Sequence, residues 1–334
     1  IAGMRNSALL LQRNKIFTDN FQLLNSLTNL VNTNSHTQEF NELLELLNTT
    51  TFTGESSFFS FAGRILRAYV IMQDDVVHAE FIYALRALGQ LDAYLAVAKQ
   101  IKRLENNSVR FTPVQFIHQS TPYIKATNFW NPFVTTNKAV GNSIEMGGKD
   151  MHNMILTGPN TGGKSTTLKA LMLSVILAQT FGIAAADELI MTPFAKLMTH
   201  MNITDDTAGG ISLFKAEVKR AQDLMNMLRA LPQDQFAFVI IDEIFTGTAP
   251  DRAEDLSYKF IEQLCKFKNC VFIDATHFKK LINLEKDTKG FCKNYHMGVE
   301  IAHGKVTKYL YKLTTGSSPI NNAEQIAQEE GILF

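Results

Sequence analysis

One eight-residue segment limits the possible folds of this chain more than any other feature. Residues 158–165 read Gly-Pro-Asn-Thr-Gly-Gly-Lys-Ser and match the pattern G-x-x-x-x-G-K-[ST] at every fixed position. The apolar run 154–156 before this segment predicts a β-strand, and apolar residues at helical spacing after it predict a helix that ends near Gly182. A strand, a glycine-rich loop and a helix in this order are typical of a P-loop nucleotide-binding domain.

The loop carries the groups that bind a nucleoside triphosphate. Its glycines let the backbone fold around phosphates with the N–H groups pointing inward, and the helix N-terminus adds positive potential. Lys164 is expected to reach the β- and γ-phosphates, and Ser165 to offer its hydroxyl to Mg²⁺. The alternative is a chance glycine-rich turn, which the flanking strand and helix argue against. The glycine-lysine segment 147–150 lacks an upstream glycine at motif spacing and predicts only a surface turn.

An apolar run over residues 238–241 ends in two carboxylates, Asp242 and Glu243. A parallel strand buried on both faces has this continuous apolar pattern. At the tip of such a strand, Asp242 is expected to hold Mg²⁺, usually through water, and Glu243 to polarise the attacking water as a general base. The second carboxylate favours hydrolysis over phosphoryl transfer to a small molecule.

A third apolar run, 271–273, leads into the segment 274–277, which ends in His277. A lone histidine more often has a structural role. His277, however, follows the strand after the acidic one, where related ATPases place a histidine that senses the γ-phosphate. We therefore predict that His277 contacts this phosphate.

The remaining patterns indicate two domains. Residues 1–110 contain no proline and carry leucine and aromatic residues at helical spacing, so we predict an all-α domain. From 111 to 334 short strand-like runs appear, and beyond residue 153 strands and helices alternate, which predicts an α/β domain with a mainly parallel sheet and flanking helices. Near the end, two apolar runs flank His303 and Gly304 and predict a β-hairpin.

Composition and charge limit the possible partners. The chain carries 32 basic and 32 acidic residues, so it has no overall electrostatic footprint for nucleic acid, and any DNA binding must depend on a local patch. No apolar run approaches the roughly 20 residues of a membrane span, and no membrane partner is expected. The three cysteines fit neither a zinc pattern nor a disulfide framework, which favours a reducing, cytoplasmic setting.

Four motifs together resemble the MutS family of DNA-repair ATPases. Segment 157–166 resembles the phosphate loop of this family, in which proline and asparagine follow the first glycine. Segments 205–217, 242–248 and 274–277 resemble its signature segment, its acidic strand end and its histidine loop. Residues 88–98 resemble its last lever helix before the ATPase. The match covers roughly residues 80–334, and the chain end is closer to short MutS-like proteins than to mismatch-repair MutS.

The resemblance implies a P-loop NTPase fold of the ABC/MutS type preceded by an all-α lever domain, with ATP and Mg²⁺ as cofactors and a homodimer with composite sites. Ser212 matches the serine that acts in trans on the γ-phosphate of the partner, and a plain N-cap is the alternative. Phe133 and Tyr311 lie where the family encloses adenine, with core packing as the alternative for both. The residues expected to contact the nucleotide through the loop are Gly158, Pro159, Asn160, Thr161, Gly162, Gly163, Lys164, Ser165 and Thr166.

Ser212 also has a local context that favours a phosphate contact. It precedes a predicted helix whose apolar face carries Phe214, Val218, Ala221 and either Leu224 or Met225. At the helix N-terminus, the serine hydroxyl, the exposed N–H groups and the positive helix end can converge on an anion.

Some positions depart from the family pattern. Thr246 stands where arginine is usual, and Trp130 and Asn131 replace the usual histidine before a proline. The Phe-x-Glu module that reads mismatches is not recognisable, because the matching letters at 40–42 belong to a leucine-rich helical pattern. Mismatch recognition is therefore not predicted, whereas ATP chemistry is.

These observations predict an ATP-dependent DNA-binding protein that acts on duplex or branched DNA in repair or recombination, cytoplasmic and nucleoid-associated if it binds DNA. An ATP-gated interaction protein that does not bind DNA is the alternative. A third possibility, the motor subunit of a membrane transporter, requires Leu-Ser-Gly-Gly-Gln just before the acidic strand. Here residues 208–212 lie about thirty positions upstream of that strand, which favours the MutS type.

Overall fold

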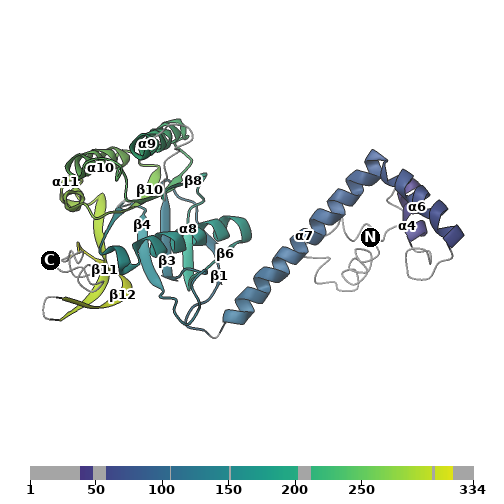
Figure 1. The fold of residues 1–334 in the computed structure, drawn as a ribbon, viewed down its shortest axis with the longest axis horizontal. Coiled ribbons are helices and arrows are strands. Elements are labelled where there is room, and N and C mark those ends of the chain that lie inside the picture. The colour runs from purple at the N-terminus through teal and green to yellow at the C-terminus, as the bar shows by residue number, and fades with distance from the viewer. Residues whose placement is uncertain are drawn as a thin grey trace. The chain divides into compact units, whose positions relative to one another are not determined.

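The computed structural model describes residues 38–47, 58–105, 107–149, 152–201, 212–302 and 305–318. The chain divides into two compact units between Lys99 and Gln100 (Figure 1). Two predicted features, residues 205–211 of the signature segment and the chain end beyond 318, lie outside the described residues.

The described part of the first unit is helical. Its helices are α4 (Gln38–Leu47), α6 (Phe58–Met72) and most of α7 (Asp75–Leu104). Helices α4 and α6 pack against each other, and Phe40 and Leu43 of α4 are fully buried. The segment expected to form a lever helix, 88–98, lies within α7, as does the division between the units.

A six-stranded sheet organises the second unit, in the order β12-β11-β5-β10-β9-β8. Its strands are β5 (Asn153–Thr157), β8 (Lys196–His200), β9 (Ala237–Asp242), β10 (Cys270–Ala275), β11 (Cys292–Ala302) and β12 (Lys305–Thr315). All neighbouring pairs from β11 to β8 are parallel, and only the edge strand β12 is antiparallel. The expected mainly parallel sheet and the terminal hairpin are confirmed, although β11 begins well before the hairpin and pairs with β5.

The strand order brings three loops to one edge of the sheet. Strand β10 lies between β5 and β9, with Ala275 opposite both Leu156 and Asp242. Because parallel strands point the same way, the loops that follow β5, β9 and β10 all leave from this edge.

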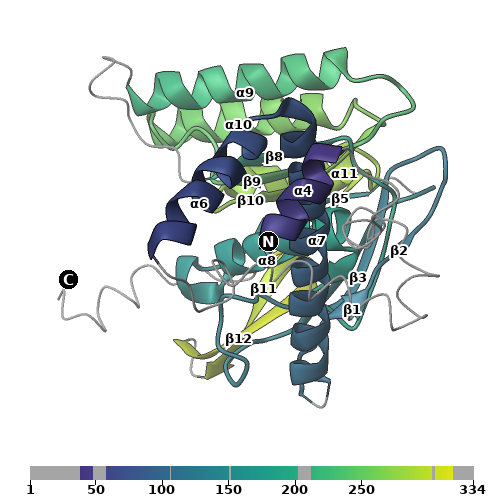
Figure 2. The same ribbon diagram turned by 90° about the vertical axis from the view of Figure 1, so that its right-hand side faces the viewer.

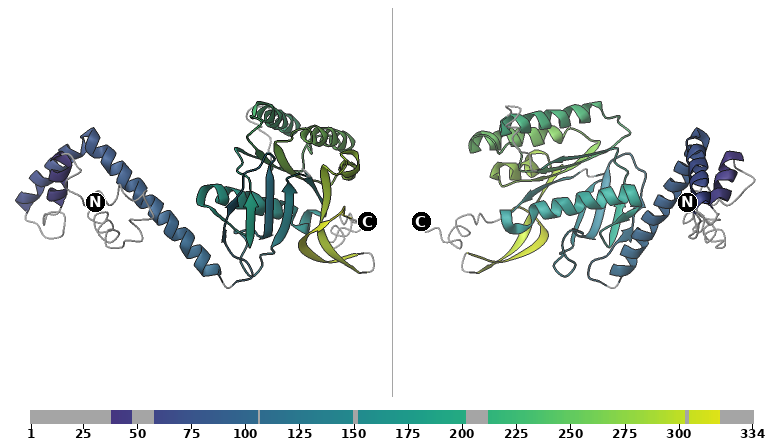
Figure 3. Two further views of the ribbon diagram at one scale, coloured as in Figure 1. Left: turned by 180° about the vertical axis from the view of Figure 1, so that it is seen from behind. Right: turned by 45° about the vertical axis from the view of Figure 1, so that its right-hand side comes forward.

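Helices cover both faces of this sheet (Figures 2 and 3). On one face, α8 (Lys164–Phe181) packs through buried residues such as Leu168 and Leu171 against alternate residues of the strands. On the other, α9 (Leu213–Ala230), α10 (Pro250–Leu264), the 3-10 helix η4 (Lys279–Asn283) and α11 (Leu284–Asp287) form a second core. Each large apolar side chain buried in these cores contributes roughly 1.5–3 kcal/mol.

The helix α9 differs from expectation in the face that it buries. Its buried residues are Glu217, Ala221, Leu224 and Leu228, whereas Val218 is 41% exposed. The predicted apolar face is therefore wrong at Val218, because the helix is rotated so that a glutamate faces the interior. The polar contacts that hold Glu217 are described below.

A smaller sheet lies next to the main one. Its strands are ordered β2 (Gln115–Phe116), β7 (Glu188–Met191), β3 (Tyr123–Phe129) and β4 (Asn142–Gly147), and a separate pair joins β1 (Thr112–Pro113) and β6 (Ile183–Ala184). Asn142 links β4 to the main sheet, since its side chain donates to the Tyr311 carbonyl and accepts from the Leu313 N–H.

The glycine-lysine segment after β4 is a turn, as predicted, but not one exposed along its length. Gly147 and Gly148 have φ of 75° and 73° and are both buried. A Cβ at Gly147 would lie 2.0 Å from the carbonyl oxygen of Pro122. The glycine is thus required by close backbone packing rather than by a surface turn alone.

The three cysteines are free thiols. Within the described ranges, no helix has the length and apolar character needed to cross a membrane.

Candidate nucleotide-binding site

The phosphate loop connects β5 to α8, as its pattern predicts. Gly158 and Gly163 have φ of 137° and 93°, a region that favours glycine. A Cβ at Gly163 would also lie 3.0 Å from the Tyr311 ring. Gly163 is the N-cap of α8, so the first N–H groups of this helix have no partner within it. This arrangement forms an anion-binding helix terminus.

Lys164 lies inside the loop, with its side chain only 3% exposed. Its Nζ donates a 2.7 Å hydrogen bond to the Gly158 carbonyl oxygen and lies 3.9 Å from Glu243 Oε1. Burial lowers the pKa of Lys164, while the charges of Glu243 and Asp242 oppose this shift. An anionic ligand beside the ammonium would compensate for the burial of its charge.

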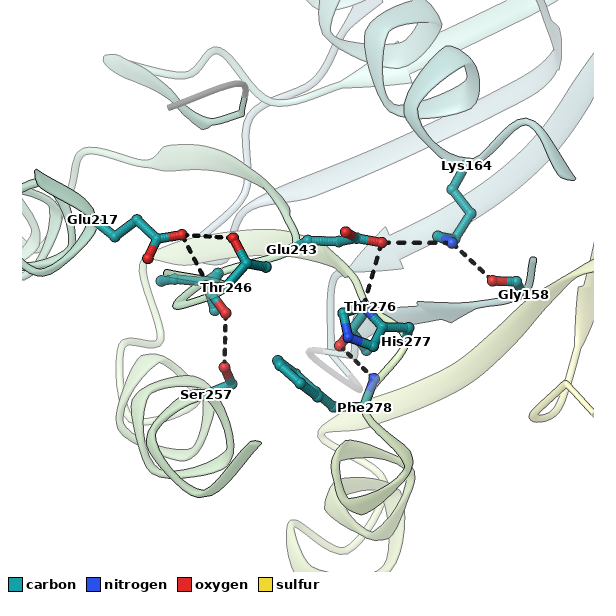
Figure 4. A network of polar contacts seen from close by, with 10 residues as sticks. Gly158, Lys164, Glu217, Glu243, Thr246, Ser257, Thr276, His277 and Phe278 are labelled. Carbon is teal, nitrogen blue, oxygen red and sulfur yellow. Dashed lines mark hydrogen bonds and ion pairs between the residues drawn. The ribbon is translucent and has the colours of Figure 1, made fainter. Parts of the chain in front are cut away.

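Glu243 and His277 meet Lys164 across the sheet edge (Figure 4). His277 Nδ1 lies 3.4 Å from Glu243 Oε1, the same oxygen that faces Lys164. The hydrogen bond from His277 lowers the pKa of Glu243 most; burial raises it, and the charges of His277 and Lys164 lower it further. The structure therefore brings together three side chains from the segments that follow β5, β9 and β10.

The backbone at Glu243 is held in an uncommon conformation. Its φ is 56°, and its N–H donates a 2.9 Å hydrogen bond to the Ala275 carbonyl. A non-glycine residue in this region is strained by about 1–2 kcal/mol and persists where its surroundings hold it. In this conformation the carboxylate lies 3.4 Å from His277, in the loop that follows β10.

Two oxygen donors suited to Mg²⁺ lie in the segments at the ends of β5 and β9. Ser165 is exposed in the first turn of α8, and Asp242 is the half-buried last residue of β9. A hydroxyl and a carboxylate are the hard donors that Mg²⁺ accepts together with phosphate oxygens. The residues present thus fit the ion.

Asp274, at the end of β10, was given no role by sequence reasoning. It is fully buried, and neither carboxylate oxygen has a hydrogen-bond partner among the described residues. Burial raises its pKa well above the usual range, as do the nearby charges of Asp242 and Glu243. The only signal in the sequence was a carboxyl within an apolar run. Two residues further on, the Thr276 hydroxyl accepts a hydrogen bond from the Phe278 N–H, and this bond spans His277.

A second polar cluster fixes the loop after Glu243. Glu217 of α9 accepts hydrogen bonds from the Thr246 N–H, the Thr246 hydroxyl and the Gly247 N–H. On the other side, Ser257 donates its hydroxyl to the Ile244 carbonyl. Thr246, where the family usually has arginine, thus bonds directly to a carboxylate. Sequence reasoning missed Glu217, because an acid inside a helical repeat usually faces water.

Ser212 is the N-cap of α9 and is exposed. Its carbonyl accepts the first helical hydrogen bond, from Ala216, but its hydroxyl makes no capping bond to the helix. The plain N-cap role considered from the sequence is therefore not the one that the hydroxyl has here.

A cavity of about 400 Å³ adjoins the phosphate loop. The loop and the start of α8 line one side of it, and Phe129, Val134, Val140 and Tyr311 contribute to the rest. Phe133 is instead 84% exposed and lines a neighbouring cavity with Trp130 and Pro132. Core packing is thus wrong for Phe133, and its contact with adenine stays a prediction.

Comparisons with known proteins agree with the motifs. The family model described as MutS domain V matches residues 154–332. The chain is 30% identical over 251 residues to the DNA mismatch repair protein MutS of Alkaliphilus metalliredigens, covering 74% of this chain and 27% of the relative.

Two eukaryotic relatives match over a longer stretch. Identity is 26% over 310 residues to the DNA mismatch repair protein MSH6 of Arabidopsis thaliana, covering 89% of this chain and 22% of the relative. It is 26% over 317 residues to the DNA mismatch repair protein Msh3 of Dictyostelium discoideum, covering 89% and 21%. The chain therefore spans about a quarter of the length of these relatives.

Proposed function

Because the chain belongs to the MutS family, we propose that it is a Mg²⁺-dependent ATPase. In this proposal it forms a homodimer on DNA, and ATP turnover at composite sites moves a helical lever formed by residues 1–110. The observation that carries the catalytic part is the convergence of Lys164, Glu243 and His277 at the edge where the phosphate loop opens.

The nucleotide is held mainly by the phosphate loop. The N–H groups of the first turn of α8 and the ammonium of Lys164 bind the phosphates, and the cavity beside Tyr311 takes the nucleoside. Mg²⁺, when bound by Ser165 and Asp242, supplies charge neutralisation at the phosphate oxygens.

Glu243 orients the water that attacks the γ-phosphate. Its lowered pKa keeps it ionised near neutral pH but also makes it a weak base. Its main contribution is therefore to position and polarise the water, and it takes up the proton late in the reaction. His277, which donates to the same carboxylate, holds it in place and faces the phosphate.

The dimer completes each site through Ser212. Its exposed hydroxyl at the N-terminus of α9 is free of a capping bond and suits a contact with the γ-phosphate bound by the partner. The nucleotide state of one protomer can then determine how the two protomers associate.

The proposed DNA role rests on the names of the relatives, which are DNA mismatch repair proteins. The proposed location is cytoplasmic, and at the nucleoid if the protein binds DNA. The second candidate, an ATP-gated protein-interaction ATPase, is favoured by the balance of 32 basic and 32 acidic residues and by exposed Tyr83, Leu85, Tyr94 and Leu95 on α7.

Two measurements test the proposal. Phosphate release with and without Mg²⁺ tests the ATPase, and binding to duplex, branched and mismatched DNA at several salt concentrations tests the DNA role. We expect Mg²⁺-dependent turnover and salt-sensitive DNA binding that changes with ATP. Turnover without binding to any of the three DNAs would favour the interaction protein, and the absence of turnover would refute the ATPase assignment.

A further inference from the structure

Helix α9 connects two parts of the proposed machinery. Ser212 stands at its N-terminus, and Glu217, one and a half turns further along, is only 2% exposed. Both carboxylate oxygens of Glu217 accept hydrogen bonds from the loop that follows Glu243, and Figure 4 shows those with Thr246. Oε1 accepts from the Thr246 N–H at 3.0 Å and the Thr246 hydroxyl at 3.1 Å, and Oε2 accepts from the Gly247 N–H at 3.1 Å.

Other contacts fix the same loop against α9. A Cβ at Gly247 would lie 2.7 Å from the backbone nitrogen of Phe214, so only glycine lets the loop approach the helix this closely. The ring of Phe214 meets that of Phe245 edge-on, with centroids 6.3 Å apart. A displacement of α9 therefore has to move the loop or break these contacts.

The loop also holds strained backbone. Glu243 and Phe245 have φ of 56° and 62°, a conformation that non-glycine residues rarely adopt. Such residues keep it only where neighbouring groups over-determine it. Glu217 accepts three hydrogen bonds from Thr246 and Gly247, which lie within four residues of Glu243 in the chain. These bonds are charge-assisted when Glu217 is ionised, and they help to hold this conformation.

We propose that Glu217 is a positioning residue that links the helix beginning at Ser212 to the orientation of Glu243. The inference rests on the proposed function, in which Ser212 contacts the γ-phosphate of the partner while Glu243 acts in its own protomer. One helix then touches both composite sites of the dimer. The occupancy of one site is transmitted through Glu217 to the water-orienting carboxylate of the other.

The main test is Glu217→Gln in the full chain. The amide keeps the shape but turns an NH₂ group toward N–H and O–H donors, so at least one contact is lost. We expect kcat for ATP hydrolysis to fall about 10- to 100-fold, because a small misplacement of a reacting group has effects of this size. KM and ATP affinity should stay within about twofold, since the phosphate loop is untouched. The matched control is Asp223→Asn, which removes a carboxylate from the exposed face of α9 and should change neither value.

A second pair of variants covers the case in which Glu217→Gln does not fold. Thr246 is exposed, and Thr246→Val removes only the hydroxyl donor, while Thr246→Ser keeps it. We expect kcat to fall severalfold in the valine variant and to be retained in the serine variant, with equal ATP affinity.

The outcomes separate the two proposals. If wild-type protein turns over ATP but folded Glu217→Gln has an unchanged kcat and only a lower Tm, the role of Glu217 is structural and the inference is wrong. Equal kcat in both Thr246 variants overturns it as well when Glu217→Gln does not fold. If the wild-type dimer itself shows no Mg²⁺-dependent hydrolysis, the proposed function fails first and the inference fails with it.

Discussion

Replacing Glu243 by glutamine tests the chemistry of the site most directly. The amide has nearly the same shape as the carboxylate, so the strained backbone at this position and its bond to Ala275 can remain. The change removes the negative charge that faces Lys164 at 3.9 Å and His277 at 3.4 Å. It also removes the group that would polarise the attacking water.

The substitution is expected to lower kcat but not to lower the affinity for ATP. Loss of the carboxylate that positions the water and finally accepts its proton lowers kcat by about 100- to 10,000-fold, which corresponds to about 3–5 kcal/mol in the barrier. The charge pair with Lys164 is worth at most about 4 kcal/mol at 3.9 Å and an effective dielectric constant near 20, and partial exposure of Glu243 to water reduces this value. Without Glu243 the ammonium keeps its bond to the Gly158 carbonyl, and the carboxylate that would repel the phosphates is gone. ATP binding should therefore be unchanged or tighter.

The assay combines phosphate release at saturating Mg²⁺-ATP with equilibrium binding of a fluorescent ATP analogue. Glu262→Gln is the control, because it removes an exposed carboxylate from α10 without touching the site. We expect the Glu243→Gln protein to retain nucleotide and, if the sites are composite, to accumulate as a dimer. A kcat within threefold of the wild-type value would refute the role of Glu243, and so would a loss of ATP affinity large enough to account for the loss of turnover.

Three further predictions concern other residues. Lys164→Ala should weaken ATP binding by about 100-fold or more, because it removes the charge that pairs with the phosphates. Tm should not fall, because burial of the ammonium destabilises the ligand-free fold. Near-normal ATP affinity by titration would contradict the phosphate-loop assignment. Mixing Lys164→Ala with Ser212→Ala protomers should restore turnover through one intact composite site per heterodimer, and no gain despite verified heterodimers would exclude shared sites. Burial of His200 lowers its pKa from 6.5 to about 4, so the unfolded chain binds a proton at a higher pH than the folded chain does. The free energy of unfolding should therefore fall by up to about 3 kcal/mol as the pH drops from 6.5 to 4. Urea unfolding of the His200→Gln variant should not show this part of the pH dependence.

The sequence by itself determined the local parts of this protein. The phosphate loop could be predicted because glycines, lysine and serine at fixed spacing act between one strand and one helix that are adjacent in the chain. The helix α8 ends at Phe181 before Gly182, where φ is 69°, as the pattern predicted. The hairpin of β11 and β12 followed for the same reason, since its strands are neighbours in the sequence.

The composition of the site, in contrast, depended on long-range pairing. Strand β10 follows β9 in the chain but lies between β9 and β5 in the sheet, and only this order brings His277 to Glu243 and Lys164. An apolar run predicts a buried strand but says nothing about which strands its N–H and C=O groups pair with.

The rotation of α9 and the lining of the cavity also depend on tertiary contacts. Val218 and Glu217 are adjacent in the sequence, and helical periodicity favoured burial of the valine. Burial of Glu217 became possible because the Thr246 and Gly247 N–H groups and the Thr246 hydroxyl, about thirty residues away, satisfy its carboxylate. In the same way, Tyr311 lines the cavity because β12 packs against β4, whereas Phe133 is not among the lining residues. Hydrogen bonds between distant segments determine such placements, because a polar side chain can be buried only where the fold supplies its partners.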